Sequence, residues 1–423
     1  MLIARGLSNG ILTKPLLTIL SSIIVLSLST INVESTVTTI HAQASNSYSV
    51  VPYIGVNVRG FYTGTAQAQN ASIYGPLPIN YYDDSFRMIS QAGMNHVRFI
   101  YFWESYEKNP SLFMNELNTV AQAADKWGIK VIYDNHQFHT SSWLDPAHGT
   151  GFPGVLFSSN PAYIYDGGGA PKSKYATLWW TNWWNRSIKD SSGTDGWTLL
   201  ADFLKKIVNT VDQHPSTLGY EIINEPQIHS DDQWSKIGQF NTFMVSTLRA
   251  VTQKTIAYSQ QIPSSPSDPT ITMTPENMAK MAPTNKTNVV FKFSSGYGVP
   301  TPNSYFAKRY DLFVRAGQLA GVPIYVGEWN VLKREKVTNV DNQTTYEINP
   351  QLSDINQTQA NFMVQKFKDT NVWGAAYWFW DFHHHKVQNY NLIDVGSDGR
   401  VQPTIYFDIL KNAYSIIRTS PSR

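Results

Sequence analysis

The stretch Tyr220–Pro226 (YEIINEP) and its counterpart Pro323–Asn330 (PIYVGEWN) decide the fold predicted for this chain. Each is a short apolar run that leads into a glutamate, Glu225 in the first and Glu328 in the second. Short apolar runs are typical of strands that a parallel sheet buries on both faces. The pattern therefore predicts two buried parallel strands, each with a carboxylate at its carboxyl end.

Strand-like and helix-like segments alternate along the chain from about Tyr48 onward. We expect strands near Tyr53–Val58, His96–Phe102, Lys130–Asp134, Leu218–Asn224, Thr255–Ser259, Val289–Ser294, Ile324–Glu328 and Trp373–Trp380. Helical periodicity predicts helices near Asp84–Ala92, Leu112–Trp127, Trp197–Gln213, Gln233–Val251, Tyr305–Ala320, Gln357–Asp369 and Ile405–Ile417. Repeated strand–helix units of this kind are typical of an α/β fold with a parallel sheet, here a (β/α)8 TIM barrel.

A single folded domain accounts for most of the chain. No internal repeat, low-complexity tract or linker marks off a second domain, so we assign residues 45–423 to one barrel. Long loops are expected after strand 3, from Gln137 to Asp195, and after strand 7, from Val331 to Asp354. Long insertions on the catalytic face of a barrel usually shape a binding cleft.

The composition favours a globular protein with a large core. Of the 423 residues, 42% are hydrophobic and 15% are charged, and the formal net charge is +2. No basic cluster stands out, which argues against a nucleic-acid partner. The chain has no cysteine, so its stability must come from packing rather than from disulfides.

The amino terminus has the order of a secretory signal. Arg5 and Lys14 precede the apolar run Leu16–Leu28, and the small residues of Ala42–Ala44 follow it. We therefore predict a signal peptide over residues 1–44 and a secreted or extracellular protein. The alternative is an uncleaved anchor at the cell surface, but the apolar run is shorter than the ~20 residues that span a bilayer. No stable membrane insertion is expected after cleavage.

The two glutamates suggest a particular chemistry. Barrel enzymes keep their active sites at the carboxyl ends of the strands. Two carboxyl groups that face each other across a sugar can break a glycosidic bond, one as acid and the other as nucleophile or base. The acid needs a raised pKa, and the nucleophile must stay ionised. Arg98, buried in its strand, could keep a carboxylate ionised, although a structural ion pair is the alternative.

Motifs in a fixed order extend this pattern over nearly the whole chain after residue 45. They are Tyr53–Asn57 (YIGVN), Arg98, Asp134–His136 (DNH), Asn224–Pro226 (NEP), Gly327–Trp329 (GEW) and Gly374–Trp380 (GAAYWFW). In this order and spacing the chain resembles glycoside hydrolase family 5, within the larger clan of cellulase- and mannanase-like barrel hydrolases. The resemblance implies a TIM barrel with the acid/base on its fourth strand and the nucleophile on its seventh.

By this resemblance Glu225 is the catalytic acid/base and Glu328 the catalytic nucleophile. Arg98 would then be the electrostatic partner of Glu328. The family works without a metal ion or an organic cofactor, so we expect neither.

The resemblance also implies four further residues that bind substrate. His136 and Asn224 would donate hydrogen bonds to the sugar, and Trp378 would stack on it. The sixth strand of the family usually delivers a histidine and a tyrosine, but Val290–Tyr297 (VFKFSSGY) has no histidine. Tyr297 can still supply the hydroxyl that contacts the nucleophile.

Two clusters have more than one interpretation. His383–His385 suggests a metal site, but adjacent histidines on a strand point to opposite faces and cannot all bind one ion. Trp179–Trp184 (WWTNWW) is either a substrate platform or a hydrophobic plug that fixes the third loop. We expect one or two of its tryptophans to be exposed in the cleft, with the others packed against the barrel.

The sequence therefore predicts a secreted, monomeric, retaining glycoside hydrolase. Its expected substrate and partner is a β-linked polysaccharide or oligosaccharide, cleaved in the manner of a cellulase, an endo-β-1,4-glucanase. A β-mannanase or another β-glycosidase of the same family is the alternative among enzymes. A catalytically silent carbohydrate-binding protein at the cell surface is the alternative from another class, since a fold alone does not establish activity.

Overall fold

The computed structural model describes residues 51–64, 77–146, 149–158, 174–260, 271–296, 305–330, 334–338, 344–348, 357–381, 391–395 and 400–418. All of them belong to the unit that spans residues 45–423. Tyr297 and His383–His385 lie outside the described residues. Within the described ranges, every helix is too short or too polar to span a lipid bilayer.

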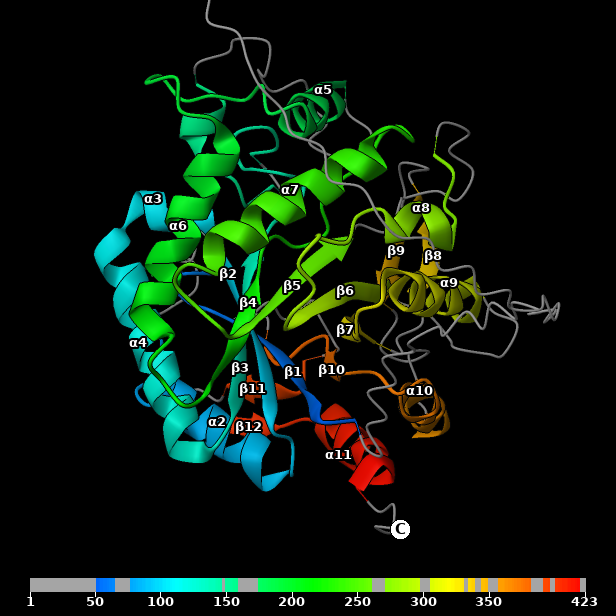
Figure 1. Ribbon diagram of the computed structural model, residues 1–423. Helices are drawn as coiled ribbons and strands as arrows, with labels where there is room; N and C mark the ends of the chain where they lie inside the picture. Colours follow the sequence, from blue (N-terminus) through cyan, green and yellow to red (C-terminus); the bar gives the residue numbers. More distant parts are fainter. Residues whose placement is uncertain are drawn as a thin grey trace, which may run out of the picture. The chain divides into compact units, whose positions relative to one another are not determined.

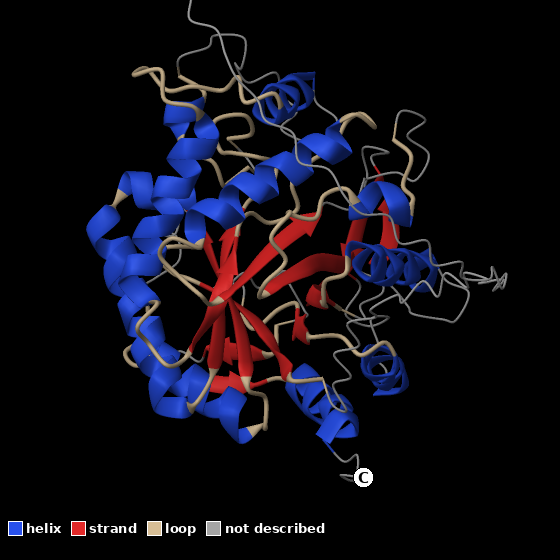
Figure 2. Ribbon diagram, in the orientation of Figure 1, coloured by secondary structure: helices blue, strands red, loops and turns tan. Residues whose placement is uncertain are grey.

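Eight parallel strands close into a barrel, and helices surround it (Figures 1 and 2). The strand order around the barrel is β1-β10-β7-β6-β5-β4-β3-β2. The barrel strands are β1 (Tyr53–Arg59), β2 (His96–Phe102), β3 (Lys130–His136), β4 (Thr217–Glu221), β5 (Thr255–Gln260), β6 (Val289–Gly296), β7 (Ile324–Trp329) and β10 (Gly374–Tyr377). The predicted (β/α)8 barrel is confirmed.

Helices follow the strands as the periodicity predicted. They are α2 (Tyr81–Gln91), α4 (Pro110–Trp127), α6 (Gly196–Val211), α7 (Gln233–Leu248), α9 (Tyr305–Ala320), α10 (Gln357–Asp369) and α11 (Ile405–Arg418). Local chemistry sets their ends. The side chain of Asp195 accepts a hydrogen bond from the backbone of Thr198 and caps α6, and Gly128 ends α4 with a φ of 67°.

The structure adds short elements that the sequence did not predict. These are α3 (Trp103–Lys108), the 3₁₀ helix η1 (Gly154–Leu156), α5 (Lys174–Trp184), α8 (Pro275–Ala279), and two hairpins, β8 (Arg334–Thr338) with β9 (Thr344–Ile348) and β11 (Ile393–Val395) with β12 (Val401–Pro403). Several lie in the long loops expected after strands 3 and 7.

The barrel interior changes from apolar to charged along the strands. A buried apolar cluster fills one level of it, and its members are Ile132, Ala257, Val290, Tyr325, Trp373 and Ala376. Side chains on a strand alternate between faces, so the next inward position lies two residues further on. On β3 that position is Asp134, and on β6 it is Lys292; both are fully buried. A level of buried charge therefore lies above the apolar level, toward the carboxyl ends of the strands.

The tryptophans of Trp179–Trp184 are packed inside, contrary to the expected partial exposure. All four are buried, at 0% to 2% exposure. Their spacing places them on one face of α5, and Nε1 of Trp180 donates to Oγ1 of Thr140 at 2.9 Å. The cluster is the hydrophobic plug of the third loop, and the expectation of tryptophans exposed in the cleft is wrong.

Candidate active site

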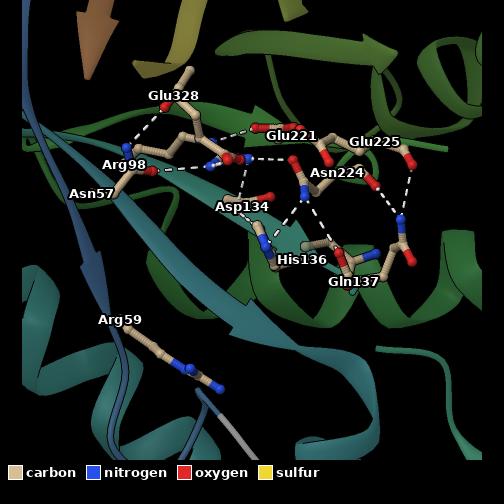
Figure 3. Close-up of polar contacts among 12 residues, drawn as sticks. Asn57, Arg59, Arg98, Asp134, His136, Gln137, Glu221, Asn224, Glu225 and Glu328 are labelled. Carbon is tan, nitrogen blue, oxygen red and sulfur yellow. Dashed lines mark hydrogen bonds and ion pairs between the residues drawn. The ribbon is translucent and has the colours of Figure 1, made fainter. Parts of the chain in front are cut away.

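Apart from Arg98, the described residues singled out from the sequence as catalytic or substrate-binding lie at or near the carboxyl ends of the strands. Arg98 is on β2, His136 ends β3, Asn224 and Glu225 follow β4, Glu328 is on β7, and Trp378 follows β10. Dashed contacts link most of them into one network in Figure 3. The carboxyl end of a parallel barrel is where its enzymes bind substrate.

Arg98 is the centre of this network (Figure 3). It is fully buried, and a guanidinium has five N–H donors. Its acceptors are Oε2 of Glu221 at 2.8 Å, Oδ2 of Asp134 at 2.8 Å, Oε1 of Glu328 at 2.9 Å, Oδ1 of Asn57 at 2.9 Å and Oδ1 of Asn224 at 2.9 Å. The expected contact with Glu328 is present. Two further anionic partners, Glu221 and Asp134, were not foreseen.

A second buried cation, Lys292 of β6, was missed entirely. Its Nζ lies 3.1 Å from Oε1 of Glu328, 3.6 Å from Oε1 of Glu221 and 3.0 Å from Oγ of Ser294. It also donates to Oδ1 of Asn224. The sequence did contain a signal, because a lysine inside the apolar run Val289–Phe293 must point into the barrel or into the layer of helices.

Glu328 is held as a carboxylate. Its side chain is only 14% exposed, and burial by itself would raise its pKa. The charges of Lys292 and Arg98 more than offset that effect, so the pKa of Glu328 is lowered from its usual value. This is the protonation state that a nucleophilic carboxylate needs.

The carboxyl group of Glu225, in contrast, is favoured in its protonated form. Burial, and then the negative charge of Glu328, raise the pKa of Glu225 to about 7. Its backbone is in the left-handed region with a φ of 43°, which is unusual for a residue other than glycine. Gln137 donates to its backbone carbonyl at 2.8 Å, and its N–H donates to the hydroxyl of Ser259 at 3.2 Å. These contacts hold the strained turn that follows β4.

His136 and Asn224 form a chain of hydrogen bonds above Asp134. Nδ1 of His136 lies 2.7 Å from Oδ2 of Asp134, and burial lowers the pKa of His136 well below its usual value. A neutral imidazole with its proton on Nδ1 leaves Nε2 as the acceptor for Nδ2 of Asn224, at 3.2 Å. In this tautomer the one N–H of His136 is used by Asp134, so donation from His136 to a sugar requires the proton on Nε2. Donation to the sugar by His136 and by Asn224 stays a prediction.

Aromatic side chains lie beside this network and on the loop after β3. The rings of Trp378 and His136 stack at 5.8 Å, and within the described part of the chain Nε1 of Trp378 has no hydrogen-bond partner. Phe138 and Trp143, on the loop after β3, are 51% and 47% exposed. Among the described residues of the third loop, these two are the exposed large aromatic side chains, whereas the tryptophans of α5 are buried. No cluster of ligands suited to a metal ion occurs among the residues described.

A barrel with one protonated and one ionised carboxyl group at its strand ends has the arrangement of a glycoside hydrolase. The sequence agrees with this class, since the family model named cellulase (glycosyl hydrolase family 5) matches residues 55–384. The chain belongs to glycosyl hydrolase family 5, and the resemblance noted from its motifs is confirmed.

Solved structures share the fold at low sequence identity. A crystal structure of endogalactoceramidase has a TM-score of 0.60 and 17% identity over 86% of this chain and 81% of that one. Endo-glycoceramidase II from Rhodococcus sp., with a five-membered iminocyclitol, has a TM-score of 0.56 and 15% identity over 86% and 78%. PbGH5A, a family 5 enzyme from Prevotella bryantii B14, has a TM-score of 0.54 and 14% identity over 86% and 97%. No curated protein matches the chain.

Proposed function

We propose that this glycoside hydrolase cleaves β-linked glycans by double displacement, with net retention of configuration. The observation that carries the proposal is the opposite protonation of two carboxyl groups. Glu328 is kept ionised by Lys292 and Arg98, and the pKa of Glu225 is raised to about 7. Glycoside hydrolases need this division between an ionised carboxylate and a protonated acid. The family resemblance, which makes Glu328 the nucleophile, favours the retaining form of the reaction.

The proposed reaction has two steps. In the first, a carboxylate oxygen of Glu328 attacks the anomeric carbon, and Glu225 gives its proton to the leaving oxygen. In the second, ionised Glu225 takes a proton from water, the water oxygen attacks the anomeric carbon, and the bond to Glu328 breaks. The carboxyl oxygens would then lie about 5 Å apart, the separation typical of retaining enzymes.

For the substrate we propose a β-1,4-linked glucan, with β-mannan as the closest alternative. Trp378 would stack on the sugar next to the scissile bond. Phe138 and Trp143 would contact sugars further along the chain, because flat sugar faces pack on exposed aromatic rings. A second candidate is a β-linked oligosaccharide carried on ceramide, suggested by the names endogalactoceramidase and endo-glycoceramidase II among structures with this fold.

A substrate panel with product analysis tests these proposals. It would contain β-1,4-glucan, β-mannan, their oligosaccharides and a glycosylceramide, and the released reducing sugar would be measured. Proton NMR of the first product made from an oligosaccharide reports its anomeric configuration. We expect the β-anomer to appear first; an initial α-anomer would contradict retention. Binding to a glycan with no product from any member of the panel would support the silent carbohydrate-binding protein instead.

We further propose that residues 1–44 are a secretory signal and that the barrel acts outside the cell as a monomer. The charged, apolar and small-residue order of Arg5 to Ala44 supports this. Amino-terminal sequencing of protein collected from the culture medium should begin at Ser45. Full-length protein that stays with the membrane fraction would favour the anchor.

A further inference from the structure

Lys292 is the next inward-facing residue of β6 after Val290, one level closer to the carboxyl ends of the strands than the apolar cluster. Val290 belongs to that apolar cluster, and the alternation of a strand turns Lys292 and Ser294 to the same inward face. The side chain of Lys292 is 0% exposed, and its Nζ reaches Glu328, Asn224 and Ser294. A lysine this deep must be matched by anionic partners, since an unpaired buried charge is strongly unfavourable.

Gly327, just before Glu328, leaves room for the stem of this lysine. A Cβ at Gly327 would lie 2.3 Å from Cε, 2.7 Å from Cγ and 3.0 Å from Cδ of Lys292. The stem therefore packs against Gly327, in the space that a side chain at this position of β7 would fill. The ammonium group emerges beside the next residue, which is Glu328.

The two cations meet Glu328 at the same oxygen. Nη1 of Arg98 lies 2.9 Å from Oε1 and Nζ of Lys292 lies 3.1 Å from Oε1. Within the described residues, no hydrogen bond or ion pair is made to Oε2 of Glu328. The two carboxylate oxygens of Glu328 therefore have different surroundings.

Charge balance makes Lys292 important to the network. Arg98 is surrounded by the three carboxyl groups of Asp134, Glu221 and Glu328. Burial raises the pKa of Asp134 to about 7, and among the groups that lower the pKa of Glu328 the largest effect comes from Lys292, ahead of Arg98. Arg98 alone is shared among too many acceptors to fix the charge of Glu328.

We propose that Lys292 is a positioning residue for the nucleophile: with Arg98 it binds Oε1 of Glu328, so that Oε2 forms and breaks the bond to the sugar. This inference rests on the proposed double displacement. Lys292 lies on the sixth strand, from which the family usually delivers a histidine that this chain lacks there.

The assignment has a consequence for each half of the reaction. In the first step a lone pair on Oε2 forms the bond to the anomeric carbon, while the leaving oxygen keeps the electrons of its bond and receives the proton of Glu225. In the second step the electrons of the C–Oε2 bond return to Glu328 as water attacks. Positive charge at Oε1 makes the carboxylate a better leaving group, so Lys292 assists the second step more than the first.

The variant Lys292→Met tests the proposal, because methionine keeps an unbranched stem and removes the charge. Lys130→Met is the matched control; Lys130 begins β3, and its Nζ donates to the carbonyl of Pro215 at 2.7 Å. The probe is the dinitrophenyl β-glycoside of the sugar that the wild-type protein hydrolyses. For Lys292→Met we expect kcat to fall roughly 10- to 150-fold, the loss of one charge-assisted contact. KM should fall as well, and a burst of dinitrophenolate should appear as the glycosyl-enzyme accumulates.

The pH dependence gives a second readout, and it does not require activity. The ionisable groups that face Lys292 are Arg98, Asp134, His136, Glu221, Glu225 and Glu328. In a carbon-13 NMR titration the transition of the Glu328 carboxyl should move to higher pH in Lys292→Met. It should be unchanged in Lys130→Met.

A chemical restoration separates charge from folding. The chain has no cysteine, so Lys292→Cys would carry a single thiol. After alkylation of the unfolded chain and refolding, the aminoethyl form restores an ammonium group, and the propyl form has the same shape without charge. The aminoethyl form should regain turnover and the propyl form should not. Equal turnover of the two, or a Lys292→Met protein with wild-type kcat and an unmoved Glu328 titration, would overturn the assignment.

Failure of the proposed function looks different from failure of this inference. If the wild-type protein hydrolyses no glycoside, double displacement is wrong, and the Glu328 titration still shows whether Lys292 controls that carboxyl. If the wild-type protein is active and Lys292→Met equals it in rate and titration, only the role of Lys292 is wrong.

Discussion

Replacing Arg98 with lysine should lower both the rate of catalysis and the stability of the fold. The number of contacts that Arg98 makes gives the size of the loss. Arginine uses all of its N–H donors here, whereas an ammonium group has three. At least two buried contacts are lost even if the lysine reaches the network. Hydrogen bonds to charged groups are worth about 1.5–3 kcal/mol each, so roughly 3–6 kcal/mol is lost in total.

Part of this lost free energy should appear as lower stability and part as slower catalysis. Contacts with Asn57, Asp134 and Glu221 join β2 to three other elements of the barrel, so we expect the free energy of unfolding in urea to fall by about 3 kcal/mol. The contact with Glu328 acts on the reaction, so kcat/KM should fall roughly 10- to 150-fold. The acid limb of the pH–rate profile should also move to higher pH, because Glu328 loses part of its positive surroundings.

Arg249→Lys is the control for this variant. Arg249 donates to four backbone carbonyls in the segments that precede β5 and β6, at the end of the barrel opposite Glu328. Its replacement should lower the free energy of unfolding and leave kcat/KM and the acid limb unchanged. A folded Arg98→Lys protein with kcat/KM within about twofold of wild type would refute the reasoning and make Arg98 a purely structural residue.

Three further outcomes are expected. Glu225→Gln should still form the glycosyl-enzyme from a dinitrophenyl glycoside, and added azide should restore turnover with a β-glycosyl azide as product; a β-azide from Glu328→Gln instead would reverse the two roles. With the pKa of Glu225 at about 7, kcat/KM for an oligosaccharide should fall as the pH rises through that value, since the acid must hold its proton; a rate that stays level to pH 9 would remove Glu225 as the acid. The raised pKa stabilises the fold at low pH, and that contribution is lost as the pH rises through about 7. Trp180→Ala should lower the free energy of unfolding by about 3–5 kcal/mol and should change the activity on short and long oligosaccharides equally. Trp143→Ala should raise KM for long oligosaccharides only. An effect of Trp180→Ala that depends on substrate length would mean that the tryptophans of α5 contact the substrate.

The barrel was predictable because its strands follow one rule. A strand buried on both faces is apolar throughout, and six of the eight expected segments end within two residues of the observed strands. The eighth was expected to reach Trp380 but ends at Tyr377. The fourth was expected to reach Asn224 but ends at Glu221. The chain turns there into the left-handed conformation of Glu225, and nothing in the sequence YEIINEP signals a positive φ at a glutamate.

The errors at the candidate site have identifiable causes. Lys292 was overlooked as part of an apolar strand, although period-two alternation places it beside Ser294 on the inward face. The partners Glu221 and Asp134 of Arg98 were not foreseen, because sequence gives the face of a side chain but not the neighbours it meets across the barrel. One or two of the tryptophans of α5 were expected in the cleft, yet their helical spacing already indicated one buried face.

Trapping the glycosyl-enzyme tests the central claim most directly. A 2-deoxy-2-fluoro β-glycoside with a dinitrophenyl leaving group slows the second step more than the first, so the intermediate accumulates on a retaining enzyme. Mass spectrometry of the digested protein should find one sugar attached to the peptide that contains Glu328, and the label should be absent from Glu328→Gln. A sugar attached at another residue, or an active enzyme that releases the inverted product and never becomes labelled, would contradict the account.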